Sequence, residues 1–318
     1  MYKVSIIISC YKNEKDIEKA IESLANQTLD NIEVIVVNDG SPDNSWEIIE
    51  RMMHNYPDKV FGYNKENGGI ASVRNYGISK VRGEYFGFLD GDDYVEPTML
   101  EKLYNKAKEE DVNYVCGGFY FTYPDHEDPF FEKEYHTPKE MMLNVHATLW
   151  NKLYKTSFVK NLNINFIEGY RYEDVSFLYK IAPHINKFAF VNEPILHYVQ
   201  REGSSMYSHN HKVKEIVYIW KDLLKYYKDN QLFDEYYDEL EYLMIKFMLG
   251  QPFRSSVKIK DKADRKLTLN MLYDTLYTNF PNWHKNKYLK ERNDPKHIYF
   301  KLVNKFTYKI FSFIFKYA

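Results

Sequence analysis

The sequence predicts an α/β protein with a mostly parallel, doubly wound sheet, followed by a helical region. In the first third of the chain, short β-branched runs alternate with segments of helical periodicity, which is the pattern of consecutive βαβ units. Polar motifs come just after several predicted strands, where open α/β sheets bind their ligands. After about His209 the helix-period segments continue without clear strand signals. We therefore expect an α/β domain over residues 1–209 and a helical region over residues 210–318.

The individual elements follow from the same patterns, taken in order along the chain. Strands are expected where β-branched and aromatic residues form short apolar runs, at 4–9, 32–37, 60–63 and 85–89. Helices are expected where apolar residues recur at helical spacing between turn signals, at 17–24, 46–52, 70–79, 97–109, 213–227, 233–249 and 262–280. Residues 123–139 are rich in Pro, Asp and Glu and are expected to form a loose excursion.

Composition argues against several classes of protein. Lys and Arg number 43 against 45 Asp and Glu, which gives a net charge of −2 and no global basic field for binding nucleic acid. Cys10 and Cys116 stand in apolar stretches without CxxC or Cys/His spacing, so neither a disulfide framework nor a zinc site is indicated. The first residues lack the pattern of a signal peptide, and no run reaches about 18 apolar residues. We expect a cytoplasmic protein.

Two motifs that contain glycine follow predicted strands. In VVNDGSPDNS, the carboxylate of Asp39 could accept a hydrogen bond from the N3 imide of a uracil, and Ser41 stands in the same turn. In NKENGGIASVRNYG, Gly69 lets the backbone approach a ligand, and Arg74 comes a helical turn later with a guanidinium that suits a diphosphate. The alternatives are a turn that starts a helix and a glycine helix entry with a surface arginine.

The acidic motif carries the strongest chemical signal. Asp90, Gly91, Asp92 and Asp93 directly follow a buried strand. Carboxylates this close repel one another unless a cation or solvent compensates them. Oxygen ligands suit a hard ion such as Mg²⁺ or Mn²⁺, which binds through one or two carboxylates plus the phosphates of a substrate. The loop lacks the ligand spacing of an EF-hand, and an acidic surface turn is the alternative.

Two further motifs supply groups for transfer chemistry. A sugar hydroxyl is a poor nucleophile and needs a carboxylate to take its proton, and we expect Asp174 of the Glu173–Asp174 pair to be this base. Arg201 and the hydroxyls of Ser204 and Ser205 could stabilise the charge that builds on a departing diphosphate. Acidic pairs also occur at helix starts for dipole reasons alone.

Taken together, the motifs resemble glycosyltransferase family 2, whose members have the nucleotide-binding GT-A fold. The resemblance covers about the first 205 residues and rests on VSIIISCYKNE, VVNDGSPD, NGGIASVRNYG, FLDGDDYVEP, WNKLYK, YEDVSF and REGSS, in that order. It implies a GT-A catalytic domain, with nucleotide-sugar binding over roughly residues 1–115 and the acceptor side over 116–209. Members are typically inverting and use one base without a covalent sugar intermediate.

The resemblance also implies roles for individual residues. Tyr11, Glu14 and Asp39 would touch the nucleotide, and Asp174 would be the catalytic base. The full nucleotide-sugar set is expected to be Ser9, Tyr11, Glu14, Asp39, Ser41, Gly69, Arg74, Asp90, Gly91, Arg201, Ser204 and Ser205. The metal set is expected to be Asp90 and Asp92 of the DxD element, with Asp92 the principal ligand, and His197. Cys10 and Val199 depart from the family's usual residues.

Three residues have competing interpretations. His197 is either an additional metal ligand or a structural histidine beside a strand. Trp150 and Lys152 are expected to line the site on the acceptor or phosphate side, although Trp150 fits a core position equally well.

The last segment, 298–317, is predicted to be one basic amphipathic helix. Its apolar face on a helical wheel comprises Tyr299, Val303, Phe306, Ile310, Phe313, Ile314 and Tyr317. Its basic face comprises Lys301, Lys305, Lys309 and Lys316. Such a helix is expected to lie at a membrane surface, and the alternative is a helix packed on the protein with solvated lysines.

We therefore expect a metal-dependent inverting glycosyltransferase, using Mn²⁺ or Mg²⁺. The expected donor is a UDP-sugar, and the expected acceptor is a hydroxyl of a glycan or lipid-linked glycan of the cell surface, at the inner face of the plasma membrane. One alternative is a nucleotidyltransferase that makes sugar nucleotides, which would need a glycine-rich triphosphate loop that we do not find. The other is a non-catalytic nucleotide-sugar binding module, which would not need Asp174.

Overall fold

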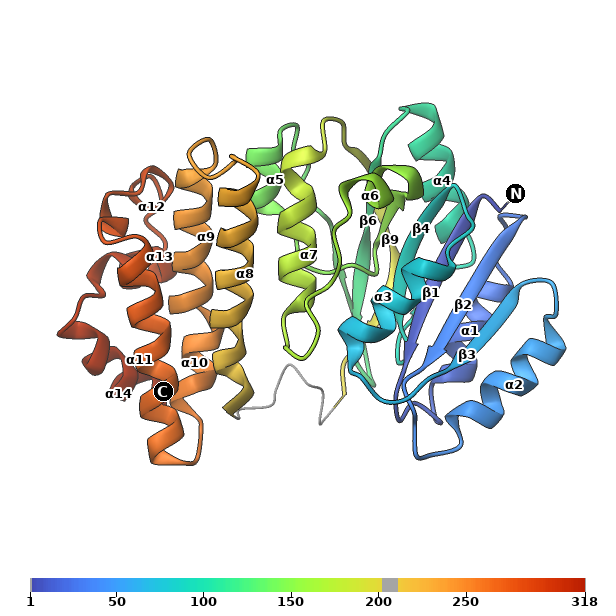
Figure 1. The fold of residues 1–318 in the computed structure, drawn as a ribbon, viewed down its shortest axis with the longest axis horizontal. Helices are drawn as coiled ribbons and strands as arrows, with labels where there is room; N and C mark the ends of the chain where they lie inside the picture. The colour runs from blue at the N-terminus through green and yellow to red at the C-terminus, as the bar shows by residue number, and fades with distance from the viewer. Residues whose placement is uncertain (1, 202–210, 318) are drawn as a thin grey trace. The chain divides into compact units, whose positions relative to one another are not determined.

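The computed structural model describes residues 2–201 and 211–317, and the chain divides into two compact units (Figure 1). Unit 1 comprises Met1–Gly169 and Glu173–Glu202. Unit 2 comprises Tyr170–Tyr172 and Gly203–Ala318. Within the described ranges, no helix is both long enough and apolar enough to cross a bilayer.

A nine-stranded sheet organises unit 1, in the order β3-β2-β1-β4-β8-β6-β9-β5, with β7 paired to β6. Its parallel half consists of β1 (Val4–Cys10), β2 (Ile32–Asn38), β3 (Val60–Asn64) and β4 (Tyr85–Asp90). The connecting helices are α1 (Ile17–Ala25), α2 (Ser45–Asn55) and α3 (Ile70–Lys80). These elements confirm the predicted βαβ pattern.

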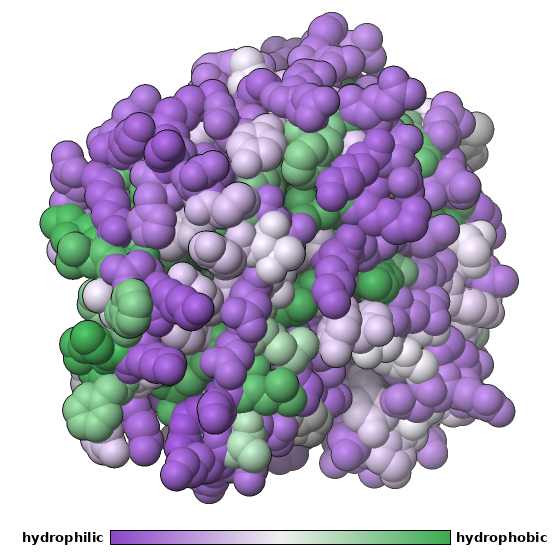
Figure 2. All heavy atoms as spheres, turned by 60° about the vertical axis from the view of Figure 1, so that its left-hand side comes forward, coloured by the Kyte–Doolittle hydropathy of each residue, from purple (hydrophilic) through white to green (hydrophobic). Residues whose placement is uncertain are grey.

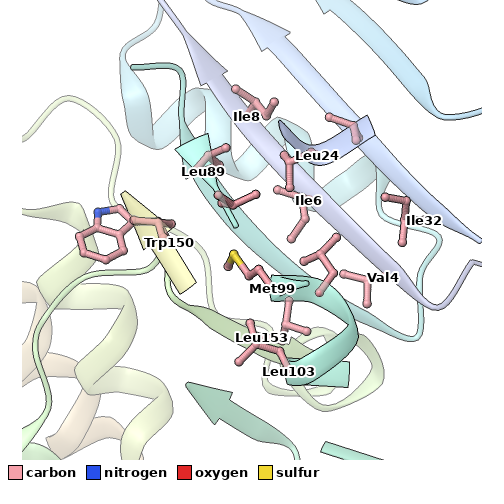
Figure 3. Close-up of a cluster of buried hydrophobic side chains, with 14 of the residues drawn as sticks. Val4, Ile6, Ile8, Leu24, Ile32, Leu89, Met99, Leu103, Trp150 and Leu153 are labelled. Atoms are coloured by element: carbon pink, nitrogen blue, oxygen red, sulfur yellow. The ribbon is translucent and has the colours of Figure 1, made fainter. Parts of the chain in front are cut away.

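Burial explains why these segments form this half of the sheet. Every residue of β2 is buried, as expected of a strand that is covered on both faces. In α1 the helical period places on one buried face the apolar residues Ile17, Ala20, Ile21 and Leu24. Leu24 belongs to the same buried cluster as Ile6 of β1 and Leu89 of β4, which are drawn together in Figure 3.

The other half of the sheet is mixed, and the sequence patterns did not predict its strands. They are β5 (Tyr94–Val95), β6 (Tyr114–Thr122), β7 (Glu127–Phe130), β8 (Lys152–Lys155) and β9 (Ala189–Val199). The helices of this half are α4 (Met99–Glu109), α5 (Pro138–Asn144), α6 (Thr156–Leu162), α7 (Glu173–Ile181) and the 3₁₀ helix η1 (Ala182–His184). Part of the expected loose excursion, 123–139, is therefore strand β7, which antiparallel pairing with β6 forms despite weak local propensity.

The strand order creates a switch point at β1. From β1 the chain passes through α1 to β2 and β3 on one side, and it returns to place β4 on the other side. Crevices of open α/β sheets form at such points, beyond the carboxyl ends of the strands. The motifs that follow β1, β2 and β4 are thereby gathered at one edge of the sheet.

Unit 2 is helical among its described residues. Its elements are η3 (His211–Glu215), α8 (Ile216–Asp229), α9 (Tyr237–Leu249), α10 (Gln251–Val257), α11 (Lys262–Asn279), η4 (Trp283–Lys285), α12 (Lys287–Lys290), α13 (Pro295–Leu302) and α14 (Thr307–Tyr317). Helices α8, α9 and α11 correspond to the three long helices predicted for this region.

The prediction of a single amphipathic helix over residues 298–317 is wrong, because a turn separates α13 from α14. The side-chain oxygen of Asn304 accepts hydrogen bonds from the backbone N–H groups of Phe306 at 2.9 Å and Thr307 at 3.1 Å. This turn starts a new helix, as an N-cap asparagine does. Consequently Tyr299 and Val303 are buried while Phe306 is exposed, so the predicted wheel face is divided.

Candidate active site

The loops after β1 and β2 are fastened to each other. The backbone N–H of Lys12 donates to the hydroxyl of Ser41 at 3.0 Å, and the backbone N–H of Asn13 donates to Ser45 Oγ at 3.1 Å. These bonds satisfy backbone donors that leave the sheet at the switch point. The first two polar motifs therefore lie together beyond the carboxyl ends of β1 and β2.

Tyr11 and Glu14 lie in the loop after β1 and are exposed. The Tyr11 side chain is 46% exposed, and its backbone N–H donates to the side-chain oxygen of Asn13 at 2.9 Å. Glu14 is exposed and accepts a hydrogen bond from the backbone N–H of Asn44 at 3.2 Å. An exposed aromatic ring held by its own backbone is suited to contact a base, which is the role predicted for Tyr11.

Asp39 ties the second motif to the end of β2. Asp39 is 3% exposed, and its Oδ1 accepts hydrogen bonds from the backbone N–H of Gly68 at 2.9 Å and from Lys65 Nζ at 2.8 Å. Its Oδ2 accepts from the backbone N–H of Gly69 at 2.8 Å. Gly69 has φ +83°, a conformation that glycine adopts at low cost. Asp39 therefore shapes the glycine turn, and its contact with a nucleotide stays a prediction.

Arg74 connects three motifs in the interior of unit 1. Its Nη1 donates to Glu173 Oε1 at 2.6 Å, and its Nη2 donates to Asp90 Oδ1 at 3.1 Å. The hydroxyl of Ser9 donates to the same Asp90 oxygen at 3.0 Å. Because Arg74 is only 5% exposed and pairs with two carboxylates, the expectation that it binds a diphosphate is corrected. In the structure Arg74 links the acidic loop to the first turn of α7.

The acidic loop after β4 is tightly built. A Cβ on Gly91 would lie 2.7 Å from the backbone oxygen of Ser9, so this position needs a glycine. The buried Asp93 accepts a hydrogen bond from the backbone N–H of Val199 at 2.9 Å, which fixes β9 beside the loop. Burial and the charge of Asp90 raise the pKa of Asp92, and burial and the charge of Asp92 raise the pKa of Asp93. Such raised values indicate carboxylates that a nearby cation would stabilise.

Arg201 supplies a positive charge to this loop. Its Nη2 contacts Asp92 Oδ2, and its Nη1 donates to Asp16 Oδ2 at 2.5 Å. The guanidinium is partly exposed and stands where a cation would face Asp92. Asp90 and Asp92 together fit a hard divalent ion that takes its remaining ligands from phosphates and water. Within the described ranges, no group of three or more His, Cys, Asp or Glu residues forms a metal cage.

The predicted catalytic pair lies at the first turn of α7. Glu173 is 7% exposed and is paired with Arg74, whereas Asp174 is half-buried. Asp174 Oδ1 accepts a hydrogen bond from the backbone N–H of Val175 at 2.8 Å. Burial and the neighbouring Glu173 carboxylate raise the pKa of Asp174 to about 7, although Arg74 opposes this shift. A carboxylate with this pKa is suited to take a proton near neutral pH.

The comparisons with known proteins agree with this geometry. Residues 5–169 match the family model described as glycosyl transferase family 2. The chain belongs to glycosyltransferase family 2. A cholesterol galactosyltransferase of Borreliella burgdorferi is 34% identical to this glycosyltransferase over 248 residues, covering 70% of this chain and 68% of the relative.

Solved structures show that the glycosyltransferase has the GT-A fold. S. aureus TarS 1–349 in complex with UDP-GlcNAc matches with a TM-score of 0.60 and 22% identity, covering 89% of this chain and 92% of TarS. The mannosyltransferase PcManGT from Pyrobaculum calidifontis, in complex with GDP-Man and Mn²⁺, matches with a TM-score of 0.58 and 14% identity. This match covers 100% of this chain and 85% of PcManGT. The predicted family, fold and class of enzyme are therefore confirmed.

His197 is not placed as a metal ligand in this glycosyltransferase. Its Nδ1 lies 2.8 Å from Glu127 Oε1, and its Nε2 lies 2.7 Å from Glu96 Oε1. Its ring stacks on Tyr94 at 4.3 Å and on Tyr120 at 5.0 Å between centroids. Both ring nitrogens thus have carboxylate partners, so the expected metal role is corrected to a structural one that joins β9 to its neighbours.

Trp150 and Lys152 are also interior residues of the glycosyltransferase. Trp150 is 4% exposed, belongs to the buried cluster and meets Phe119 edge-on at 4.6 Å. Lys152 is fully buried, and its Nζ donates to Asn151 Oδ1 at 2.7 Å and pairs with Glu132 at 3.4 Å. Neither side chain presents a surface to an acceptor, which corrects the expected acceptor role. Trp150 instead takes the alternative core position.

Ser204 and Ser205 lie outside the described residues. Asp16 was missed because a lone acid ahead of α1 carries no motif, and only the structure shows its bond to Arg201. Lys65 was missed for the same reason, although its amino group pairs with Asp39.

Proposed function

We propose that the glycosyltransferase moves a sugar from a nucleotide diphosphate donor, UDP-linked, to a hydroxyl of a glycan or lipid-linked acceptor, with inversion and with a divalent metal. The observation that carries this proposal is the Arg74 bridge. It joins Asp90 of the acidic loop to Glu173, the chain neighbour of Asp174, so that hydrogen bonds hold the acidic loop and the first turn of α7 together.

The chain's own residues account for the transfer. The acceptor hydroxyl attacks the anomeric carbon as Asp174 takes its proton. The bond between that carbon and the β-phosphate oxygen breaks, and the nucleoside diphosphate leaves with the electron pair on this oxygen. A single displacement at the anomeric carbon, assisted by one base, inverts the configuration there. Retention through two displacements would require a second carboxylate as the nucleophile. Arg201, now against Asp92, can pair with the departing diphosphate. A Mn²⁺ or Mg²⁺ ion on Asp92 and Asp90 would neutralise phosphate charge there.

The comparisons support the choice of donor and metal. TarS was solved with UDP-GlcNAc, and PcManGT was solved with GDP-Man and Mn²⁺. Tyr11 would contact the base, and Asp39, Glu14, Ser9, Ser41, Gly69 and Gly91 would form the rest of the nucleotide side. We propose that the ion pair between Arg74 and Asp90 holds the nucleotide-binding loops in place.

A lipid-linked acceptor in surface-polysaccharide synthesis is the proposed target. The Borreliella burgdorferi relative is named for cholesterol, and a Bacillus subtilis relative, 31% identical over 215 residues, is named for minor teichoic acid biosynthesis. Such acceptors would place the enzyme in the cytoplasm, at the inner face of the plasma membrane.

A donor panel tests the proposal. Purified protein is incubated with Mn²⁺ and single nucleotide sugars, and release of nucleoside diphosphate is measured for the natural chain, Asp92→Ala and Asp128→Asn. Asp128 is an exposed carboxylate on β7 and serves as the matched control. We expect release from one UDP-sugar, lost in Asp92→Ala and kept in Asp128→Asn. Binding of UDP without release favours the binding module, and pyrophosphate release from UTP and a sugar phosphate would establish the nucleotidyltransferase.

A further inference from the structure

Helix α14 and the residue just before it leave large apolar side chains in solvent. Phe306, Ile310, Phe313, Ile314 and Tyr317 are between 47% and 81% exposed, and we call these five residues the apolar stripe. Figure 2 shows hydrophobic side chains among hydrophilic ones on the face that it brings forward. Contiguous exposed groups of this size mark interaction surfaces.

The opposite side of α14 is already packed on its own unit. Tyr308 is 5% exposed and meets Phe253 at 5.2 Å between ring centroids. The ring centroids of Phe311 and Phe315 lie 4.8 Å and 5.0 Å from that of Tyr299. Contacts from the first turn to the last hold the helix along its length, so α14 presents its side, not its end, to a partner.

The segment that carries the stripe is basic. The segment from Pro295 to Tyr317 contains no Asp or Glu, and its lysines are Lys296, Lys301, Lys305, Lys309 and Lys316. A second copy of the chain would bring the same cations face to face, which disfavours self-association through this surface. Anionic lipid headgroups have the complementary charge.

A basic cluster adjoins α14, and its members are Lys246, Arg254, Arg292 and Lys296. Arg292 Cζ lies 5.0 Å and Lys246 Nζ lies 5.8 Å from the ring centre of Tyr242. Arg254 Cζ lies 5.2 Å from the ring centre of Phe315, which joins the cluster to α14. These cations come from α9, α10, the segment before α13 and the first turn of α13.

The members of the cluster repel one another. Burial and the charges of Lys296 and Arg292 lower the pKa of Lys246 to about 8. Burial and the charges of Arg254 and Arg292 lower the pKa of Lys296, and Asp294 offsets this only in part. A bound phosphate would relieve this repulsion by charge-assisted hydrogen bonds.

We propose that the apolar stripe and the basic cluster dock unit 2 on a bilayer that contains anionic phospholipids. The stripe enters the interface while α14 lies parallel to the surface, and the exposed lysines of the same segment, Lys305, Lys309 and Lys316, contact headgroup phosphates. The basic cluster, on the packed side of α14, adds to the positive potential of this face. The inference rests on the location given in the proposed function, but it concerns binding alone and is measured without sugar transfer.

Vesicle flotation tests this surface with the full chain. Vesicles of phosphatidylcholine alone are compared with vesicles that contain about one third phosphatidylglycerol. The variants are Phe313→Ser with Ile314→Ser, and Arg254→Glu with Lys296→Glu. The matched control is Phe131→Ser, which removes a similarly exposed aromatic, 50% exposed, from unit 1. Circular dichroism verifies that each variant folds.

The natural chain is expected to float with anionic vesicles and poorly with phosphatidylcholine alone. Each double variant should lower the floating fraction about fivefold, and Phe131→Ser should leave it unchanged. Absence of flotation, equal flotation of folded stripe variants, or a stripe-dependent dimer in sedimentation would overturn the proposal. Nucleoside diphosphate release in the same preparations reports separately on the proposed reaction.

Discussion

Arg74 Nη1 donates a hydrogen bond to Glu173 Oε1 at 2.6 Å, although 99 positions of the chain separate the two residues. The same guanidinium reaches Asp90, so one buried cation links α3, β4 and α7. Both of its partners are acids in or near the interior, and Arg74 pairs with each of them. The arrangement of the acidic loop relative to Asp174 therefore depends on this residue.

Arg74→Ala is expected to lower the free energy of unfolding by about 3 kcal/mol or more, because it leaves a buried carboxylate without its partner. Urea denaturation measures the change. Arg51→Ala is the matched control: its pair with Glu18 is exposed, and its loss is expected to cost less than about 1 kcal/mol. Equal effects of the two variants would contradict the structural role of the Arg74 bridge.

The rate of transfer should depend on the protonation of Asp174. A base must be deprotonated, and the pKa of Asp174 is raised to about 7, so kcat/KM should rise with pH through about 7 and then level off. Glu173 is the neighbouring charge that raises this pKa, so Glu173→Gln should move the rise to lower pH. A pH profile of the natural chain and the variant measures both effects. A profile that is flat between pH 5 and 9, about two units either side of this pKa, would exclude Asp174 as the base.

Arg201 is expected to influence metal and product steps in opposite directions. In Arg201→Ala the guanidinium no longer contacts Asp92, so the metal concentration for half-maximal activity should fall. At saturating metal, kcat should fall about tenfold or more, because the departing diphosphate loses a cation. Metal titrations of diphosphate release measure both quantities, and Arg201→Lys should restore part of kcat. An unchanged metal requirement would show that Arg201 does not compete for Asp92.

Asp39 is expected to matter for folding as well as for the nucleotide. Asp39→Ala removes the acceptor for the Gly68 and Gly69 backbone N–H groups and should lower the free energy of unfolding by about 2 to 4 kcal/mol. Asp39→Asn keeps one oxygen and should lose less. Thermal or urea unfolding without nucleotide gives the comparison. An unchanged free energy of unfolding in Asp39→Ala would mean that the glycine turn is stable without the hydrogen bonds to Asp39.

Periodicity in the sequence was enough to predict the parallel half of the fold. Buried β2 and the apolar face of α1 repeat at the spacing of their own secondary structure, so local pattern and final packing agree. Strand β7, with the sequence EDPF, has no such pattern and exists because β6 offers a partner. Pairing of this kind depends on residues far away in the chain.

The candidate site shows the same division. Asp92 and Asp174 were selected from their motifs, and their roles in metal binding and proton transfer stay predictions. Arg74 and His197 were assigned ligand roles and Lys152 an acceptor role, yet each is paired with a carboxylate that the sequence does not place nearby. Local motifs identify chemistry, whereas the partners that satisfy a buried charge come from the tertiary fold.

The most direct test of the account compares UDP binding with turnover in Asp174→Asn. Asparagine keeps the size of the side chain but cannot accept the proton of the acceptor hydroxyl at neutral pH. With metal present, the variant is expected to bind UDP as tightly as the natural chain and to lose about a hundredfold or more of sugar transfer. Transfer at the natural rate with unchanged UDP binding would contradict the assignment of Asp174 as the base that drives the reaction.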